Sequence, residues 1–211
     1  LIYASTSSVY GLNQTMPLAE TASVNHPLTL YSATKKSNEL MAHSYSYLFQ
    51  LPTTGLRFFT VYGPWGRPDM AYFDFSKNIF ENKEIIVYNN GQMKRDFTYI
   101  SDIIDGILES MNSIPEQIKS HSIELQSNIA PFRLLNLGNN NPVGLLDFIN
   151  TLENSLGKKG VIKFAEMQNG DVVETWADLI LTKKIINYNP KIDISEGLLI
   201  FAKWFKAYCK V

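Results

Sequence analysis

Apolar and polar positions along the chain follow two periods, one typical of strands and one typical of helices. Short apolar or β-branched runs predict strands at residues 1–4, 53–60, 85–88, 95–99, 132–137 and 161–164. Apolar residues spaced by three and four predict helices at 31–50, 71–81, 102–111, 141–156, 178–186 and 194–208. Because strands and helices alternate, the pattern predicts an α/β fold built on a parallel sheet.

Local signals indicate where these helices begin and end. Pro52 stops the first helix, Ser101 is expected to cap the third, and Pro142 and Gly157 are expected to open and end the fourth. The polar stretch 112–131 is expected to form an exposed loop.

Composition excludes several classes of protein. With 19 basic and 20 acidic residues among 211, the chain offers no electrostatic footprint for nucleic acid, so no nucleic-acid partner is expected. No apolar run approaches about 20 residues, so no membrane segment is expected. The single cysteine, Cys209, excludes an internal disulfide and favours a cytoplasmic protein. His26, His43 and His121 show no metal-ligand spacing, so no metal is expected.

The first residues have the pattern of a buried strand already in progress. Residues 1–4 run directly into Ser5, Thr6, Ser7 and Ser8, which is typical of the carboxyl end of a parallel strand, where α/β sheets bind ligands. No G-x-G-x-x-G turn for a cofactor pyrophosphate occurs in the chain. We therefore expect these residues to be the C-terminal portion of a longer protein that carries such a turn in its first half.

Tyr31 and Lys35 form the most informative local motif. Residues four apart share one face of a helix, about one turn from each other. An ammonium group at that distance stabilises a phenolate, which makes Tyr31 a candidate base near neutral pH. The upstream hydroxyl run could pass or hold the proton. The ordinary alternative is a core tyrosine beside a solvated lysine.

Several segments resemble a known family. Residues 4–11 together with Tyr31-x-x-x-Lys35 resemble extended short-chain dehydrogenase/reductases that act on nucleotide sugars. Residues 55–70, 90–100, 135–143 and 170–178 are similar to UDP-glucuronate 4-epimerases in particular. The resemblance implies the C-terminal part of a Rossmann-type parallel sheet plus a smaller α/β substrate-binding domain. Residues 1–65 would belong to the NAD-binding domain and 66–211 mainly to the nucleotide-sugar domain, with 95–111 and 132–137 returning to the first.

The resemblance also implies roles for individual residues. Tyr31 would be the catalytic base and acid, Lys35 would bind the nicotinamide ribose, and Thr6 would lie beside the sugar 4-hydroxyl. The other NAD-binding residues would be Ser5, Phe58 and Val61. For the substrate, the uronate carboxylate would be bound by Thr6, Ser7, Ser8 and Thr60, the diphosphate by Arg67 and Arg95, the uracil by Tyr88, and the uridine ribose by Asp171.

Each of these roles has an ordinary structural alternative. Both arginines could be solvated surface residues, Tyr88 a sheet aromatic, Asp171 a turn former and Thr60 a strand residue. Trp65, Trp176 and Trp204 are expected to be packing residues.

The implied reaction is NAD-dependent epimerisation of UDP-glucuronate to UDP-galacturonate at C4 through a 4-keto sugar. Related 4,6-dehydratases carry Asp-Glu where Ser7 and Ser8 stand, and related decarboxylases carry Glu at position 8, so two serines favour epimerisation. The alternatives are a UDP-glucose/galactose 4-epimerase and a non-catalytic UDP-sugar-binding remnant. The complete enzyme is expected to be a homodimer, and this chain alone is expected to be inactive and to bind NAD weakly.

Overall fold

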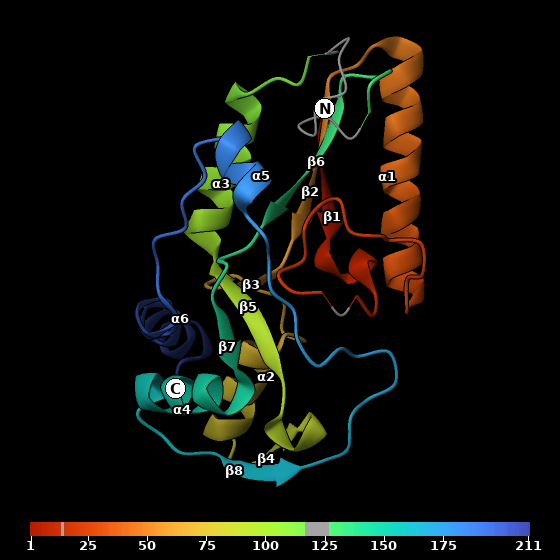
Figure 1. Cartoon of the computed structure of the whole chain (residues 1–211). Helices are drawn as coiled ribbons and strands as arrows, with labels where there is room; N and C mark the ends of the chain where they lie inside the picture. Colours follow the sequence, from red (N-terminus) through yellow and green to blue (C-terminus); the bar gives the residue numbers. More distant parts are fainter. Residues whose placement is uncertain (14, 117–126) are drawn as a thin grey trace.

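A three-stranded parallel sheet forms one half of the computed structural model, which describes residues 1–13, 15–116 and 127–211. Its strands are β1 (Ile2–Thr6), β2 (Thr53–Phe58) and β6 (Phe132–Leu137), in the order β1-β2-β6 (Figure 1). The α/β fold with parallel strands that the hydrophobic pattern predicts is therefore confirmed. Strand β6 is buried along its whole length, and β2 is buried up to Phe58.

Strand β1 differs from the prediction of a strand buried from its first residue. Leu1 is exposed and Ile2 is half-buried, whereas Ser5 and Thr6 at the other end are buried. The reason is that β1 pairs only with β2 among the described strands, so its apolar start lies at an edge of this sheet.

Two helices cover opposite faces of the sheet. Helix α1 (Leu30–Phe49) connects β1 to β2, and α3 (Ile100–Asn112) lies on the other side (Figure 1). Thr29 caps α1, its hydroxyl accepting a hydrogen bond from the backbone N–H of Ser32 at 3.1 Å. The predicted helix 31–50 is thus confirmed to within one residue at each end.

A second group of strands continues from the first. Strands β3 (Thr60–Tyr62) and β5 (Lys94–Tyr99) are parallel, and β7 (Pro142–Gly144) pairs antiparallel with β5. A separate parallel pair joins β4 (Glu84–Val87) to β8 (Val161–Phe164).

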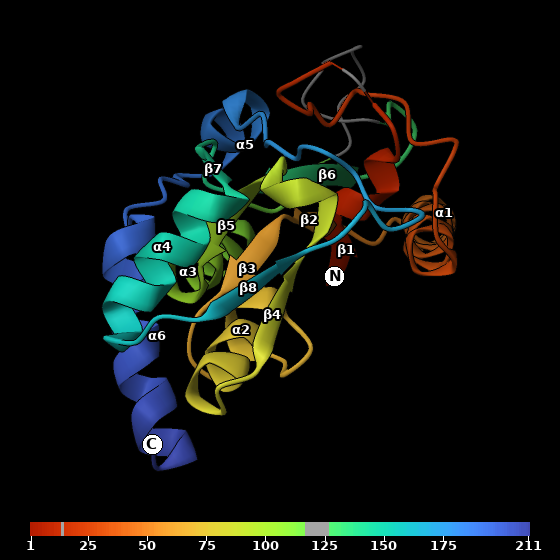
Figure 2. The ribbon, with the colours of Figure 1, turned by 90° about the horizontal axis from the view of Figure 1, so that it is seen from below.

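Helices cover this second group of strands on the side away from α1 (Figure 2). They are α2 (Ala71–Phe80), α4 (Leu145–Leu156) and α6 (Ile194–Cys209); the short α5 (Ile180–Ile185) lies near β6. Their shared core is rich in aromatic side chains, among them Tyr62, Phe97, Phe148, Phe201 and Phe205.

Three boundaries differ from the predictions. The expected strand 53–60 divides at Phe59, whose N–H bonds to Leu137, because the chain then leaves one sheet for the other. Pro142 begins strand β7 rather than a helix, since β5 offers a partner there, and α4 starts after Gly144. Ser101 is not a cap, because α3 already begins at Ile100.

The C-terminal end of the fourth predicted helix is confirmed, since Gly157 ends α4 in the left-handed conformation at φ 68°. Of the expected loop 112–131, residues 117–126 lie outside the described residues, and His121 lies there too.

Candidate functional site

Hydroxyl, aromatic and basic side chains gather where β1 and β2 end. The carboxyl ends of parallel strands are where open α/β sheets form ligand clefts. A cavity of about 550 Å³ opens at this place, between the end of β1, the first turns of α1 and the loop that follows β3. Most of the predicted site residues line it: Ser5, Thr6, Ser7, Ser8, Tyr31, Lys35, Phe58, Thr60, Val61 and Arg67.

Tyr31 and Lys35 lie on the first turns of α1 and both line this cavity. The Tyr31 side chain is 51% exposed. The Lys35 ammonium donates a hydrogen bond to the carbonyl oxygen of Ala4 at 3.2 Å, which anchors it against the end of β1. The two residues of the predicted motif therefore share one cavity, with the cation held in place by the strand.

A tight turn holds the neighbouring hydroxyl groups. Strand β1 ends at Thr6 and continues into the 3-10 helix η1 (Ser7–Tyr10). The Thr6 hydroxyl accepts a hydrogen bond from the Ser8 N–H and donates one to the Ser8 hydroxyl, both at 3.2 Å. Ser5 is different, because its hydroxyl points to Glu39 at 2.7 Å and is already used. The turn thus presents Thr6, Ser7 and Ser8 to the cavity, while the Ser5 hydroxyl faces the interior.

Three of the predicted nucleotide-binding residues, Tyr88, Arg95 and Asp171, line a second cavity that meets the first at Thr60. This cavity measures about 560 Å³ and is lined by Thr60, Tyr88, Arg95 and Asp171, among others. A smaller hollow of about 160 Å³ is lined by Ser7, Ser8, Thr60, Arg95 and Asp171. Because Thr60 lines all three, the hydroxyl turn and the Tyr88 region are neighbouring parts of one depression.

Arg95 and Asp171 are paired with each other. The guanidinium donates to the Asp171 carboxylate at 2.7 Å and to the backbone oxygen atoms of Lys94 and Val173 at 2.9 and 3.2 Å. Burial lowers the pKa of Arg95, and the adjacent carboxylate opposes this shift. The structure therefore links two side chains that the resemblance assigned to different parts of a substrate.

Arg67 lies at the rim of the first cavity. Its side chain is 70% exposed, and its guanidinium forms two hydrogen bonds with Asp69 at 3.1 and 2.8 Å. Trp65 nearby is 78% exposed, with its ring against those of Trp204 and Tyr208. These ring contacts confirm the prediction that Trp65 is a packing residue, although the side chain is exposed on a loop.

Size alone does not identify the site. A cavity of about 590 Å³ at the opposite end of β1 is lined by apolar and hydroxyl side chains, including Leu1, Ile107 and Met111, with no acidic or basic side chain among the described residues that line it. Among the described residues, no three His, Cys, Asp or Glu side chains lie close enough together to hold a metal ion. Nor does any helix there combine the length and apolar character needed to cross a bilayer.

The profile of the NAD dependent epimerase/dehydratase family matches residues 1–125, more than half of the chain. The chain belongs to the NAD-dependent epimerase/dehydratase family. The sequence resemblance to this family is thereby confirmed.

Individual members of the epimerase/dehydratase family are similar over nearly the whole chain. Protein CapI of Staphylococcus aureus is 48% identical over 100% of this chain and 64% of its own length. A probable UDP-glucuronate 4-epimerase of Rhizobium meliloti is 43% identical over 97% of this chain and 61% of its own. A crystal structure of UDP-glucuronic acid 4-epimerase from Bacillus cereus, in complex with UDP-glucuronic acid and NAD, superposes with a TM-score of 0.84 at 34% identity, covering 98% of this chain and 61% of that one. The chain thus spans less than two thirds of these relatives.

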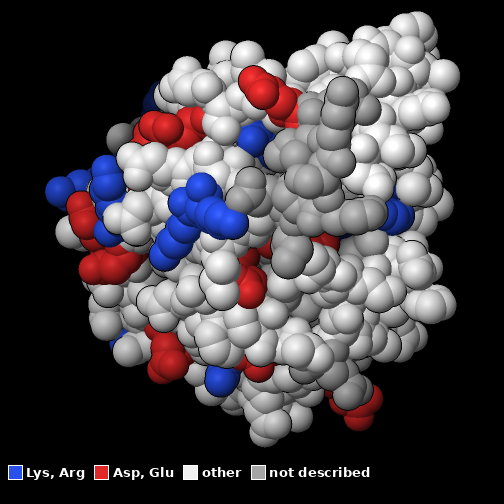
Figure 3. All heavy atoms as spheres, turned by 45° about the horizontal axis from the view of Figure 1, so that its top comes forward, with Lys and Arg blue, Asp and Glu red and all other residues white. Residues whose placement is uncertain are grey.

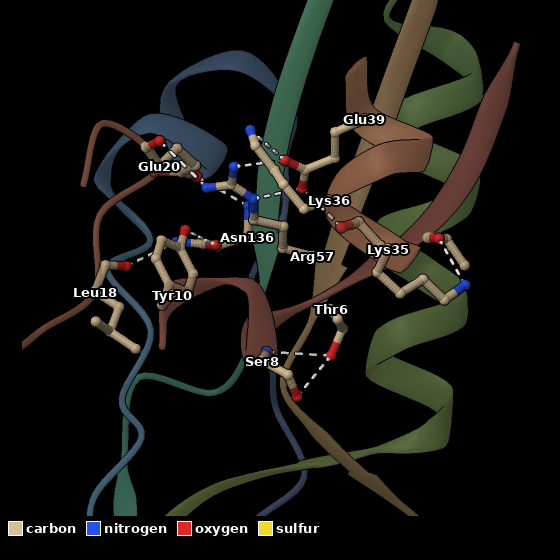
Figure 4. Close-up of polar contacts among 12 residues, drawn as sticks. Thr6, Ser8, Tyr10, Leu18, Glu20, Lys35, Lys36, Glu39, Arg57 and Asn136 are labelled. Atoms are coloured by element: carbon tan, nitrogen blue, oxygen red, sulfur yellow. Dashed lines mark hydrogen bonds and ion pairs between the residues drawn. The ribbon is translucent and has the colours of Figure 1, made fainter. Parts of the chain in front are cut away.

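A buried ion pair lies near the hydroxyl turn and was not predicted from the sequence (Figure 4). Arg57 donates to the Glu39 carboxylate through Nε at 2.8 Å and through its terminal nitrogen at 3.0 Å. Both residues are at most 2% exposed. Burial would raise the pKa of Glu39, but the hydrogen bonds and charge of Arg57, with help from Ser5 and Lys36, hold it below its ordinary value. A charged residue inside the apolar run 55–59 is the signal that could have revealed the pair.

A second set of buried contacts extends this pair toward β6. The Arg57 guanidinium lies 4.8 Å from the centre of the Tyr10 ring, and the Tyr10 hydroxyl donates to Asn136 at 2.7 Å. Burial raises the pKa of Tyr10 to about 12, even though Arg57 acts in the opposite direction. The N–H of Asn136 donates to the carboxylate of Glu20 at 2.9 Å. Tyr10 is therefore a protonated structural residue, in contrast to the half-exposed Tyr31.

Proposed function

We propose that the full-length protein inverts C4 of a UDP-hexuronic acid, converting UDP-glucuronate and UDP-galacturonate into each other with NAD. The observation that carries this proposal is the lining of the first cavity. It combines a tyrosine, several hydroxyl groups and two cations, Lys35 and Arg67, and the described residues that line it include no Asp or Glu. Such a lining suits an anionic sugar and lacks the carboxylate that water elimination would require.

The residues near Tyr31 fit a nicotinamide dinucleotide. Phe58 and Val61 offer a partly buried apolar wall for a flat ring, and Tyr31 and Lys35 offer polar groups for a ribose. Bound there, NAD would supply reversible hydride transfer at C4 of the sugar. Relatives support this assignment, since the Bacillus cereus enzyme is described in complex with NAD and UDP-glucuronic acid.

Tyr31 is the proposed base and acid. Its phenolate would take the proton of the 4-hydroxyl as C4 is oxidised and would return it after the 4-keto sugar has turned over in the site. Lys35, one helical turn away, would stabilise the phenolate and bind the ribose. Thr6 would hold the 4-oxygen, so that the proton moves along a defined hydrogen bond.

The serines have a second proposed role, which is to protect the intermediate. A 4-keto uronic acid is a β-keto acid and loses CO₂ readily. Ser7, Ser8 and Thr60 would bind its carboxylate through neutral donors, which keeps the group charged and fixed away from the geometry in which the C–C bond breaks. This role explains why hydroxyl side chains, rather than acids, face the cavity.

The second cavity is proposed to hold the nucleotide. Arg95 would bind the diphosphate, since a planar guanidinium suits phosphate oxygens, and Asp171 would accept from the uridine ribose while keeping Arg95 oriented. Tyr88 would stack on the uracil, and Arg67 would close the diphosphate site from the rim. Residues 1–65 would then supply the cofactor side and 66–211 mainly the sugar side, with 95–111 and 132–137 returning to the first.

We further propose that the complete enzyme is a cytoplasmic homodimer. The outward face of α1 carries Leu40, Met41, Tyr45 and Leu48, all more than half exposed. The side of the molecule where α1 lies shows few charged groups (Figure 3). A face of this kind is typical of a helix that packs on a second copy.

A substrate comparison tests the proposed function. The full-length protein is incubated with NAD and, separately, with UDP-glucuronate, UDP-glucose and UDP-galactose, and the products are separated by anion-exchange chromatography. The uronate is expected to have the highest kcat/KM and to give UDP-galacturonate without pentose. A preference for UDP-glucose or UDP-galactose would replace the uronate by a neutral sugar, and the absence of turnover with all three would contradict an epimerase.

A further inference from the structure

We infer that Glu39 and Arg57 are positioning residues for the proposed reaction, because one carboxylate holds together the three elements that carry the reacting groups. Glu39 belongs to α1 and its partner Arg57 to β2 (Figure 4). The second partner, Ser5, belongs to β1. The inference rests on the proposed function, since it concerns the geometry of Tyr31.

The two partners of the Glu39 carboxylate on the strands are each adjacent to a residue of the proposed site. Ser5 precedes Thr6, and Arg57 precedes Phe58. Ser5 and Arg57 lie directly opposite each other in the parallel pairing of β1 and β2, so the carboxylate bridges the two strands at their carboxyl ends. A shift of the Glu39 carboxylate would therefore move the hydroxyl turn, the nicotinamide wall and α1 relative to one another.

Besides Glu39, contacts in its second half fix helix α1: Ala42 packs on the cluster of Ala130, Phe132 and Leu134, and the His43 ring lies edge-on to Phe132 and hydrogen-bonds to Ser127 at 2.9 Å. The fully buried side chains of α1 are Ser32, Glu39 and Ser46, none of which is apolar. Lys35, one turn before Glu39, reaches the carbonyl oxygen of Ala4, and this contact requires α1 and β1 to keep their spacing. The hydrogen bonds of Glu39 therefore join the first half of the helix, which carries Tyr31 and Lys35, to the carboxyl ends of β1 and β2.

The ion pair is better explained by geometry than by stability. A buried ion pair can often be replaced by apolar residues without loss of stability, because desolvation offsets the attraction. A bidentate guanidinium–carboxylate pair instead specifies direction, since its two parallel hydrogen bonds, here 2.8 and 3.0 Å, allow one relative orientation. Such orientation is what a proton transfer between Tyr31 and a sugar hydroxyl needs.

The test compares Glu39→Gln with a matched control in the full-length protein. Glu20 is also a buried carboxylate, but its side chain accepts from Asn136 and Thr182, and its link to Arg57 runs through the Glu20 backbone oxygen, which a glutamine keeps. Glu39→Gln should lower kcat for UDP-glucuronate by about 10²-fold with little change in KM, as a misplacement near 1 Å does. The acid limb of the kcat–pH profile should also move to higher pH, because Lys35 would stabilise the phenolate less. Glu20→Gln should keep the wild-type kcat and profile.

Ser5→Ala removes only the hydrogen bond from β1 to the Glu39 carboxylate and should shift kcat and the profile in the same direction, to a smaller extent. It also serves if Glu39→Gln does not fold. A wild-type kcat and pH profile in both the Glu39→Gln and Ser5→Ala variants would overturn the inference. Equal losses of kcat in Glu39→Gln and Glu20→Gln, each explained by a smaller fraction of folded protein, would also overturn the inference.

A structural measurement separates this inference from the proposed function. If the wild-type protein turns over no UDP-sugar, the proposed function fails, and crystal structures of wild type and Glu39→Gln decide the positioning role. The contact between Lys35 Nζ and the Ala4 oxygen, 3.2 Å here, should be lost in the variant. Its retention would overturn the inference whatever the activity.

Discussion

The phenol of Tyr31 and the hydroxyl of Tyr10 show how surroundings decide what a tyrosine can do. Tyr10 is buried, donates to Asn136 and has a raised pKa, so it stays protonated and structural. Tyr31 is half exposed in a cavity, with an ammonium one turn away. Of these two tyrosines, Tyr31 alone lines a cavity beside a lysine one helical turn away, which is why we propose it as the base.

Replacing Tyr31 by Phe should therefore lower kcat by at least about 10²-fold while leaving UDP affinity nearly unchanged, because the phenolic proton is needed only in the chemical step. Steady-state kinetics and calorimetric titration with UDP provide the measurement in the full-length protein. Tyr45→Phe, on the outward face of the same helix, is the control and should match wild type. A Tyr31→Phe enzyme that keeps a tenth of wild-type kcat would remove this residue from the role of base.

Ser8→Glu tests whether the neutral hydroxyl turn selects a uronate. The new carboxylate would face the substrate's own, and like charges about 4 Å apart repel by about 4 kcal/mol at an effective dielectric near 20. The kcat/KM for UDP-glucuronate should fall by orders of magnitude, with residual product drifting toward decarboxylated pentose. The matched variant Ser8→Gln has nearly the same size without the charge and should lose much less. Equal losses in the two variants would show that size, rather than charge, matters.

At the scale of elements, the sequence predicted what depends on near neighbours in the chain. The helix 31–50 was visible because its signals repeat within a few residues. Strand β7 was not, because Val143 is extended only through pairing with Arg95, nearly fifty positions away. The same holds for the site: the Tyr31–Lys35 motif could be predicted because its two residues are near each other in the sequence. The Arg57–Glu39 and Arg95–Asp171 pairs depend on tertiary structure that spacing does not reveal.

Two of the buried carboxylates, Glu39 and Glu20, should respond to acid in opposite directions. The pKa of Glu39 is lowered in the folded state, so its contribution to stability is present above its ordinary value of 4.5 and is lost as pH falls below it. Burial raises the pKa of Glu20, although its hydrogen bonds oppose the shift, so its contribution is present below 4.5 and is lost as pH rises through the higher folded value.

Urea unfolding of the full-length protein at several pH values around 4.5 measures these contributions. The difference in the free energy of unfolding between wild type and Glu39→Gln should shrink on acidification, and that between wild type and Glu20→Gln should grow. Parallel differences for the two variants would contradict the assigned shifts.

At the scale of the whole molecule, the exposed face of α1 predicts a dimer. Light scattering coupled to gel filtration should give twice the protomer mass for the full-length protein, and Leu48→Glu should shift it toward the monomer by placing a charge on an apolar face. Leu199→Glu, at an exposed apolar position of α6, is the control and should remain dimeric. A monomeric wild type at micromolar concentration would contradict the proposal.

The chain passes from the sheet of β1, β2 and β6 to the sheet of β3, β5 and β7 at Thr60. Thr60 lines both the cavity that contains Tyr31 and the cavity that contains Tyr88. In our account this junction lets a single UDP-hexuronate place C4 beside Tyr31 while its nucleotide lies near Tyr88. On this proposal the sugar would lose and regain hydrogen at C4 without leaving the protein.

The most direct test follows the hydrogen at C4. The full-length protein is incubated with NAD and UDP-glucuronate deuterated at C4, and the product is examined by proton NMR and mass spectrometry. The account predicts UDP-galacturonate that retains the deuterium at C4, because the hydride that leaves one face of the sugar returns to the other. A product that has lost the label to solvent, or a deuterated substrate recovered without inversion, would contradict it.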